Sequence, residues 1–113
     1  MTGNAVQRRV TRKIEEHSVV LFMKGSELMP QCGYSRTALG ILKRYSDDVE
    51  VVDVLSGPTE EYRDALEDET GWTTIPQAFA EGELLGGADI LKQLDDSGEL
   101  AEKLDEDPAS APF

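Results

Sequence analysis

The sequence of 113 residues contains one cysteine, Cys32, and one histidine, His17. A single thiol excludes an internal disulfide, so the sequence does not favour an oxidising compartment. A metal site made only of side chains from one chain lacks the cysteine and histidine ligands that such sites need. No apolar run approaches the ~20 residues of a membrane-spanning helix. We therefore expect a cytoplasmic protein without a membrane segment, whose thiol takes its sulfur partner from outside the chain.

Basic residues are also scarce. Eleven lysines and arginines stand against 23 acidic residues, which gives a net charge of −12. So acidic a chain repels phosphate backbones, and we expect no nucleic-acid partner. With few lysines among its basic residues, the composition suggests a proteome adapted to concentrated salt, although an ordinary acidic protein has the same signature. The length fits a single domain with one core.

Four of the eleven basic residues lie near the start of the chain: Arg8, Arg9, Arg12 and Lys13. A basic start is typical of transit peptides. Apolar residues recur at helical spacing in the same segment, however, and predict an amphipathic helix over roughly 4–17. We interpret this segment as the first helix of the fold, with His17 as a cationic group near its end rather than a catalytic residue.

Cys32 lies between two predicted elements. An apolar run over 18–23 predicts a buried strand, and a helical pattern begins directly after the cysteine, over about 33–45. A helix N-terminus carries partial positive charge and unpaired N–H groups. Together with a nearby ammonium from Lys24, it lowers a cysteine pKa and favours the reactive thiolate. The alternative, an unreactive buried residue, fits poorly with the proline, glutamine and glycine beside the cysteine.

The remaining chain predicts further alternation of strands and helices. We expect a strand over 49–55 that is buried on both faces, followed by a helix that begins at Pro58 and ends at Gly71. Two strands joined by the turn Glu81-Gly82 come next. Gly86-Gly87 then precedes a further helix, and Ser97 caps the last helix. We expect the acidic segment 105–113 to be a flexible tail.

Three ordered motifs resemble those of one family. They are Met23-Lys24-Gly25 with Pro30-Gln31-Cys32-Gly33-Tyr34-Ser35, then Trp72-Thr73-Thr74-Ile75-Pro76-Gln77, and finally Gly86-Gly87-Ala88-Asp89. In this order and spacing they resemble the monothiol glutaredoxins, from about residue 5 to residue 104. The resemblance implies an α/β thioredoxin fold with a four-stranded mixed sheet flanked by about five helices. It places the domain at 1–104.

The residues themselves and the same resemblance together give nine candidate site residues. They are Lys24, Cys32, Tyr34, Arg63, Ile75, Pro76, Gly87, Ala88 and Asp89. Cys32 is implied as nucleophile and metal ligand, and Arg63 as a contact for the glutathione carboxylate. Pro76 is implied as a cis-proline, although trans is the default from sequence alone. From the residues alone, Arg63 is an i,i+4 partner for Glu67.

Two roles follow from a lone thiol. Ser35 stands where a second cysteine would close a Cys-x-x-Cys disulfide, so the chain needs an external thiol, glutathione or another γ-glutamyl thiol. The resemblance implies a [2Fe–2S] cluster, which needs four thiolate-type ligands. Two Cys32 thiolates and two small thiols supply these four ligands in a homodimer bridged by the cluster. We expect the protein to be a monomer without the cluster and to serve iron–sulfur client or assembly proteins. The alternative is a monothiol oxidoreductase acting on mixed disulfides through Cys32.

Several positions depart from the family pattern or leave their role open. The long loop 25–31 and Ser35 match the cluster-transfer class and favour that role. Tyr34 replaces the usual phenylalanine, and it fits equally well as a core residue or as a shield over the thiol. Thr73 replaces a proline, and Glu67 stands where many relatives carry a lysine, which bears on affinity for an anionic thiol. A redox-sensing module without turnover is the weaker third interpretation.

Overall fold

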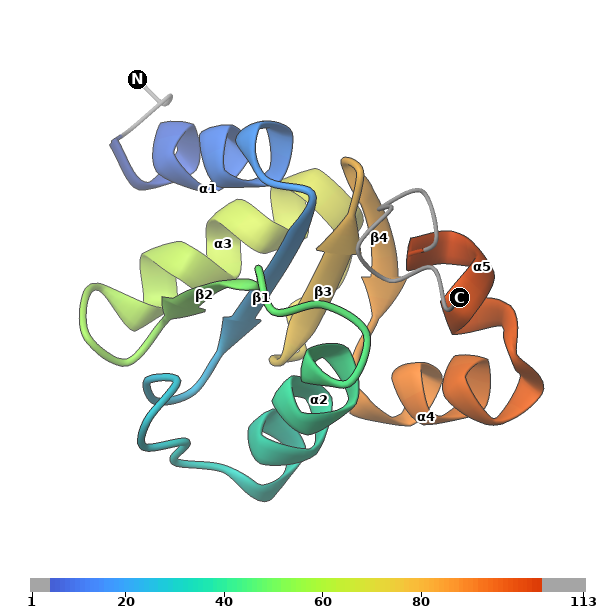
Figure 1. Ribbon diagram of the computed structural model, residues 1–113. Helices are drawn as coiled ribbons and strands as arrows, with labels where there is room; N and C mark the ends of the chain where they lie inside the picture. Colours follow the sequence, from blue (N-terminus) through green and yellow to red (C-terminus); the bar gives the residue numbers. More distant parts are fainter. Residues whose placement is uncertain (1–4, 105–113) are drawn as a thin grey trace.

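The computed structural model describes residues 5–104 (Figure 1). In chain order, its elements are α1 (Ala5–Glu16), β1 (Val19–Met23), α2 (Gly33–Lys43), β2 (Glu50–Asp53), α3 (Thr59–Thr70), β3 (Gln77–Ala80), β4 (Glu83–Gly86), α4 (Ala88–Ser97) and α5 (Glu99–Leu104). The predicted four-stranded mixed sheet with five helices is confirmed. The tail predicted over 105–113 lies outside the described residues.

The sheet has the strand order β2-β1-β3-β4. Strand β1 pairs in parallel with β2, where Leu21 lies opposite Val51, and antiparallel with β3, where Leu21 lies opposite Ala78. Strand β4 completes the sheet antiparallel to β3. All five residues of β1 are buried. This central strand therefore carries the chain rigidly up to the loop that precedes Cys32.

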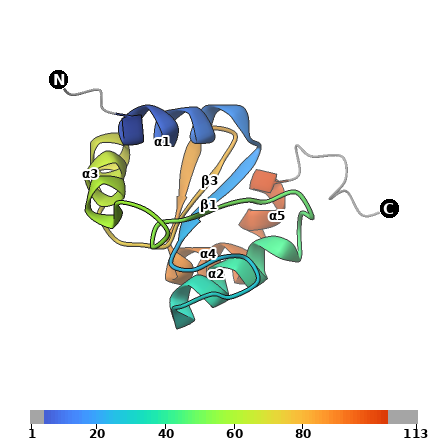
Figure 2. The ribbon, with the colours of Figure 1, turned by 90° about the vertical axis from the view of Figure 1, so that its left-hand side faces the viewer.

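Helices cover both faces of the sheet (Figure 2). Successive side chains of a strand point to opposite faces, and β1 is apolar on both. Its residues Val20 and Phe22 pack with α1 and α3, and Phe22 meets Phe79 edge to face with ring centroids 5.8 Å apart. Its residues Val19, Leu21 and Met23 pack with α2, α4 and α5. Two apolar layers thus fix the position of β1.

Three predicted details are corrected. The second strand is shorter than the predicted 49–55, and it lies at the edge of the sheet. Only Val52 within it is fully buried, so the prediction of burial on both faces is wrong, because an edge strand lacks one neighbour. Pro58 is the residue before α3 rather than its first residue, while Gly71 ends that helix with φ of 84° as predicted. Ser97 is the last residue of α4, and its hydroxyl accepts a hydrogen bond from the Glu99 N–H at 3.3 Å.

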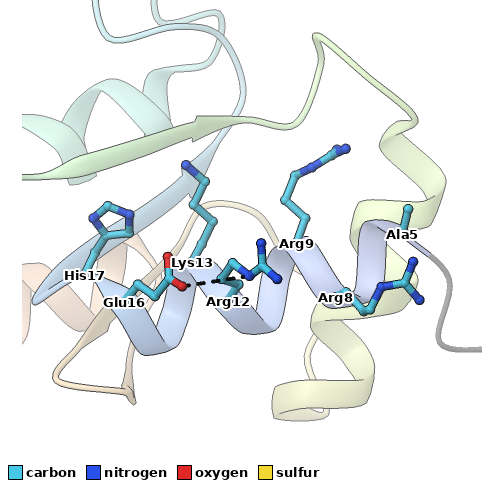
Figure 3. A pocket seen from close by; sticks show the side chains of 7 residues that line it. All are labelled: Ala5, Arg8, Arg9, Arg12, Lys13, Glu16 and His17. Atoms are coloured by element: carbon cyan, nitrogen blue, oxygen red, sulfur yellow. Dashed lines mark ion pairs between the residues drawn. The ribbon is translucent and has the colours of Figure 1, made fainter.

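Figure 3 shows the basic side chains that project from helix α1, whose buried residues are Val6, Val10 and Ile14. Lys13 Nζ lies 2.5 Å from a carboxylate oxygen of Glu50 on β2, and Arg12 pairs with Glu16 at 3.8 Å. His17 Nδ1 lies 4.0 Å from Glu50 as well. The charges of Lys13 and Arg12 are therefore partly neutralised by neighbouring carboxylates. In the described part of the chain, no helix is both long enough and apolar enough to traverse a bilayer.

Candidate thiol site

The loop between β1 and α2 is closed by its own backbone. The Gln31 N–H donates to the Lys24 carbonyl at 2.9 Å, and Ser26 and Met29 exchange backbone hydrogen bonds at 3.2 Å. The tip of the loop is exposed, with 91% of Leu28 accessible to solvent. Because Gln31 is bonded back to Lys24, the chain returns to the end of β1, and Cys32 follows directly after this contact.

Gly25 makes this closure possible. Its φ is +99°, a conformation that residues with a Cβ rarely adopt. A Cβ at this position would lie 2.4 Å from the Gln31 nitrogen and 2.5 Å from the Met29 oxygen. The Gly25 N–H also donates to Asp53 Oδ1 at 2.9 Å, which ties the start of the loop to the end of β2. The glycine after Lys24 is thus a geometric requirement of the loop.

Cys32 is the residue that caps the N-terminus of α2. Its backbone is extended (φ −149°, ψ 138°) and its side chain is only partly exposed. The N–H of Ser35 lowers the pKa of the thiol most, the N–H of Tyr34, the Ser35 hydroxyl and the Lys24 ammonium lower it further, and partial burial opposes them. The helix start therefore contributes more than the lysine to a thiolate at this position.

Ser35 has a structural role besides its effect on the thiol. It is completely buried, and its Oγ accepts a hydrogen bond from the Lys24 N–H at 3.0 Å. The hydroxyl has one proton, and hydrogen bonding from this side chain lowers the Cys32 pKa. Ser35 thus connects the end of β1 to the thiol through the first turn of α2.

A cavity of about 360 Å³ lies next to the first turn of α2, where Tyr34, two residues after Cys32 in the sequence, forms part of its lining. Its walls come from the first turn of α2, from the segment before β3 and from the first turn of α4. The lining residues are Tyr34, Trp72, Thr74, Ile75, Pro76, Gly87, Ala88, Asp89 and Ile90. Because Tyr34 lines this cavity and is 64% exposed, the interpretation of Tyr34 as a core residue is wrong.

The start of α4 approaches the cavity through two glycines. Gly86 has φ of +133°, and a Cβ there would lie 2.7 Å from the Ile90 Cβ. Gly87 is the N-cap residue and makes no side-chain cap, so N–H groups of the first turn remain available beside Asp89. The glycine pair therefore forms a turn and leaves the start of α4 open to the cavity.

The Ile75–Pro76 peptide bond, on another wall of the cavity, is cis, as the resemblance implies.

Six of the nine predicted site residues line one cavity, namely Tyr34, Ile75, Pro76, Gly87, Ala88 and Asp89. Cys32 precedes the turn of α2 that lines the cavity, and Lys24 follows β1 and lowers the pKa of the Cys32 thiol. Neither of the two is part of the lining. Arg63 does not belong to the lining. Its Nε is buried and has no hydrogen-bond partner among the described residues. The sequence interpretation left Trp72, Thr74 and Ile90 out of the site, although the first two belong to a quoted motif.

The described residues 5–104 contain no cluster of three or more His, Cys, Asp or Glu side chains able to hold a metal ion. One thiolate at the edge of a cavity is the donor set that this chain offers. It suits a group whose other ligands come from elsewhere.

Comparison with known proteins places this geometry among glutaredoxins. The glutaredoxin family model matches residues 19–85. The chain is 43% identical over 100 residues to a chloroplastic bifunctional monothiol glutaredoxin of Arabidopsis thaliana, covering 85% of this chain and 33% of that protein. It is 44% identical over 87 residues to a monothiol glutaredoxin of Porphyra purpurea described as uncharacterized, covering 77% and 79% of the two chains. The chain thus spans a third of the longer relative and most of the shorter one.

The fold is shared with a solved structure of similar sequence. The solution structure of a reduced apo glutaredoxin from poplar superposes with a TM-score of 0.77 at 38% identity, covering 90% of this chain and 92% of that chain. The predicted thioredoxin fold is therefore confirmed.

Proposed function

The chain belongs to the glutaredoxin family, among the monothiol glutaredoxins, and from this premise we propose that it binds a [2Fe–2S] cluster with glutathione or another γ-glutamyl thiol. The cluster bridges a homodimer, which separates into monomers without it. The protein stores the cluster or transfers it to iron–sulfur client or assembly proteins.

One observation supports this proposal most strongly. The only thiol of the chain lies partly exposed, with a lowered pKa, beside a cavity lined by none of the other ligands a cluster requires. A [2Fe–2S] cluster takes four thiolate-type ligands. Two Cys32 thiolates and two bound small thiols reach that number. Since half of the ligands are held noncovalently, the cluster can leave with little rearrangement of the protein.

The cavity suits a peptide thiol with one amine and two carboxylates. The carboxylate of Asp89 faces the amine, and the N–H groups of the first turn of α4 receive the neighbouring carboxylate. The backbone of Ile75 pairs with the extended peptide in the manner of an added strand. Lys24 supplies a cation near the thiol for the second carboxylate. Arg63 does not line the cavity and has to turn toward it to make the carboxylate contact that the family resemblance implies.

Thiol–disulfide exchange is the second candidate, favoured by the exposed thiolate. The Cys32 thiolate attacks the glutathione sulfur of a mixed disulfide, and the client thiol leaves with a proton. A second glutathione thiolate then attacks the glutathionyl sulfur on Cys32, which releases oxidised glutathione and regenerates the Cys32 thiolate. Each of the two steps forms one disulfide bond and breaks one disulfide bond, so no further oxidant is needed.

Anaerobic reconstitution with iron, sulfide and glutathione tests the proposal. We expect the wild-type protein to gain the visible absorbance of a [2Fe–2S] cluster and to become a dimer by size-exclusion chromatography. Cys32→Ser abolishes both the cluster and mixed-disulfide turnover, whereas Lys24→Ala weakens both, because one cation near the sulfur is lost.

The same preparation separates the two candidates. Cluster yield near one per two chains with slow turnover of a glutathione mixed disulfide supports cluster carriage. Fast turnover without any cluster would support the exchange enzyme. A Cys32→Ser protein that assembles a cluster with wild-type absorbance would refute the assignment of Cys32 as a cluster ligand.

A further inference from the structure

Gln77 is one of only two polar side chains with no exposed surface in the described part of the chain. It is the first residue of β3 and lies opposite Phe22 of β1. Phe22 belongs to the layer formed with α1 and α3, so Gln77 enters this layer near the end of α3. A buried amide costs free energy unless it is hydrogen-bonded.

The Gln77 amide is bonded to the segment that forms the cavity wall. Its Nε2 donates to the Trp72 carbonyl at 2.9 Å, and its Oε1 lies 3.2 Å from the Thr70 hydroxyl oxygen. The Trp72 N–H donates to the same hydroxyl at 3.0 Å. A carbonyl only accepts, so this contact fixes which end of the amide faces Trp72. Both backbone polar groups of Trp72 are thus held, one by each side chain.

The wall has few other anchors. Residues 72–76 belong to no helix or strand. Across residues 5–104, they also take part in none of the backbone–backbone hydrogen bonds found outside those elements. Four of these five residues line the cavity: Trp72, Thr74, Ile75 and Pro76. Their arrangement therefore depends on the side-chain bonds of Thr70 and Gln77 at one end, on β3 at the other, and on the packing of buried Ile75 into the apolar layer with α1 and α3.

We propose that Gln77 is a positioning residue that holds the 72–76 wall in the shape required by the thiol ligand, and so sets affinity for the ligand without touching it. This inference rests on the proposed function, since the ligand is the γ-glutamyl thiol. The ligand pairs with the Ile75 backbone most tightly when the wall is already ordered, because ordering the wall during binding costs free energy and reduces affinity. The chemistry of Cys32, which is determined at the start of α2, is independent of this wall.

The test uses Gln77→Met, which keeps the length of the side chain and removes its hydrogen bonds. Trp72 is the only tryptophan, so its fluorescence reports on the wall directly. We expect lower Trp72 anisotropy and stronger acrylamide quenching. We also expect a KM for a glutathione mixed disulfide raised roughly tenfold, the effect of losing one hydrogen bond. The rate of Cys32 alkylation by iodoacetamide stays within about twofold of wild type, since that reaction does not use the wall.

Thr70 provides an independent pair of variants. Thr70→Val removes the hydroxyl at constant shape and is expected to reproduce the Gln77→Met result, while Thr70→Ser keeps the hydroxyl and stays near wild type. Tyr45→Phe is the stability control, because it removes the hydrogen bond that Tyr45, just after α2, donates to Asp95 of α4, away from the wall. It is expected to lower the melting temperature without changing Trp72 anisotropy.

The inference is overturned if Gln77→Met and Thr70→Val keep wild-type anisotropy and KM, or if Tyr45→Phe raises the KM as much as they do. Should the wild-type protein fail to bind glutathione, the proposed function fails. The anisotropy of the same variants then still decides whether Gln77 holds the wall.

Discussion

The thiol side of the site and the wall opposite it are held in different ways. On the thiol side, backbone N–H groups close the loop: Gln31 N–H donates to the Lys24 carbonyl, and Lys24 N–H donates to Ser35 Oγ. The wall over 72–76 has no backbone–backbone hydrogen bond among the described residues, and its polar contacts come from the side chains of Thr70 and Gln77. The ionisation of Cys32 therefore depends on the thiol side, whereas ligand affinity depends on a wall that side chains hold in place.

This difference predicts that mutations separate the two properties. Changes on the thiol side alter the ionisation and reach of Cys32, and changes on the wall alter affinity at constant reactivity. Three substitutions test the separation.

Gly25→Ala is expected to have the largest effect. The new Cβ would lie 2.4 Å from the Gln31 nitrogen at a φ of +99°, so the loop has to rearrange. We expect a loss of at least about 3 kcal/mol in the free energy of unfolding, with Cys32 displaced. Urea denaturation and iodoacetamide kinetics measure both. Gly40→Ala, within α2 and with open space around it, is the control and should be neutral or slightly stabilising. Equal stability of the two variants would contradict the account of the loop.

Ser35→Ala is expected to raise the Cys32 pKa. The variant loses the Ser35 hydroxyl, which is one cause of the lowered Cys32 pKa, but keeps the Ser35 N–H, which is the larger cause. The pH profile of iodoacetamide alkylation therefore moves to higher pH, while remaining below that of the unfolded protein. The free energy of unfolding falls by about 1–3 kcal/mol, because the Lys24 N–H loses its acceptor. A profile that stays in place would show that the hydroxyl does not interact with the sulfur.

Asp89→Asn, on the cavity side, is expected to have the smallest effect. If Asp89 receives the ligand amine as proposed, removal of this exposed charge raises the glutathione KM about threefold to tenfold. Alkylation of Cys32 should be unchanged, which sharpens the contrast with Ser35→Ala. Asp96→Asn in the same helix is the matched control, since Asp96 does not line the cavity. Equal effects of the two variants would assign the change to net charge alone.

Local sequence signals predicted the thiol side well. The apolar run before the loop and the helical pattern after Cys32 fixed its place at a helix start, because these signals lie within a few residues of the cysteine. The wall was harder to predict. The exposure of Tyr34, the separation of Arg63 from the cavity and the bonds of Gln77 depend on how α3, β3 and α4 pack together. The edge position of β2 was missed for the same reason, since an apolar run does not show how many neighbours a strand has.

Composition supported broader predictions that the fold does not test. The net charge of −12 remains the basis for expecting a salt-rich cytoplasm and no nucleic-acid partner.

Native mass spectrometry of the reconstituted protein tests the central claim most directly, that Cys32 depends on a borrowed thiol. The account predicts a complex of two chains, one [2Fe–2S] cluster and two glutathione molecules, which falls apart into apo monomers when glutathione is removed. A cluster that stays bound to the protein without any small thiol would contradict it.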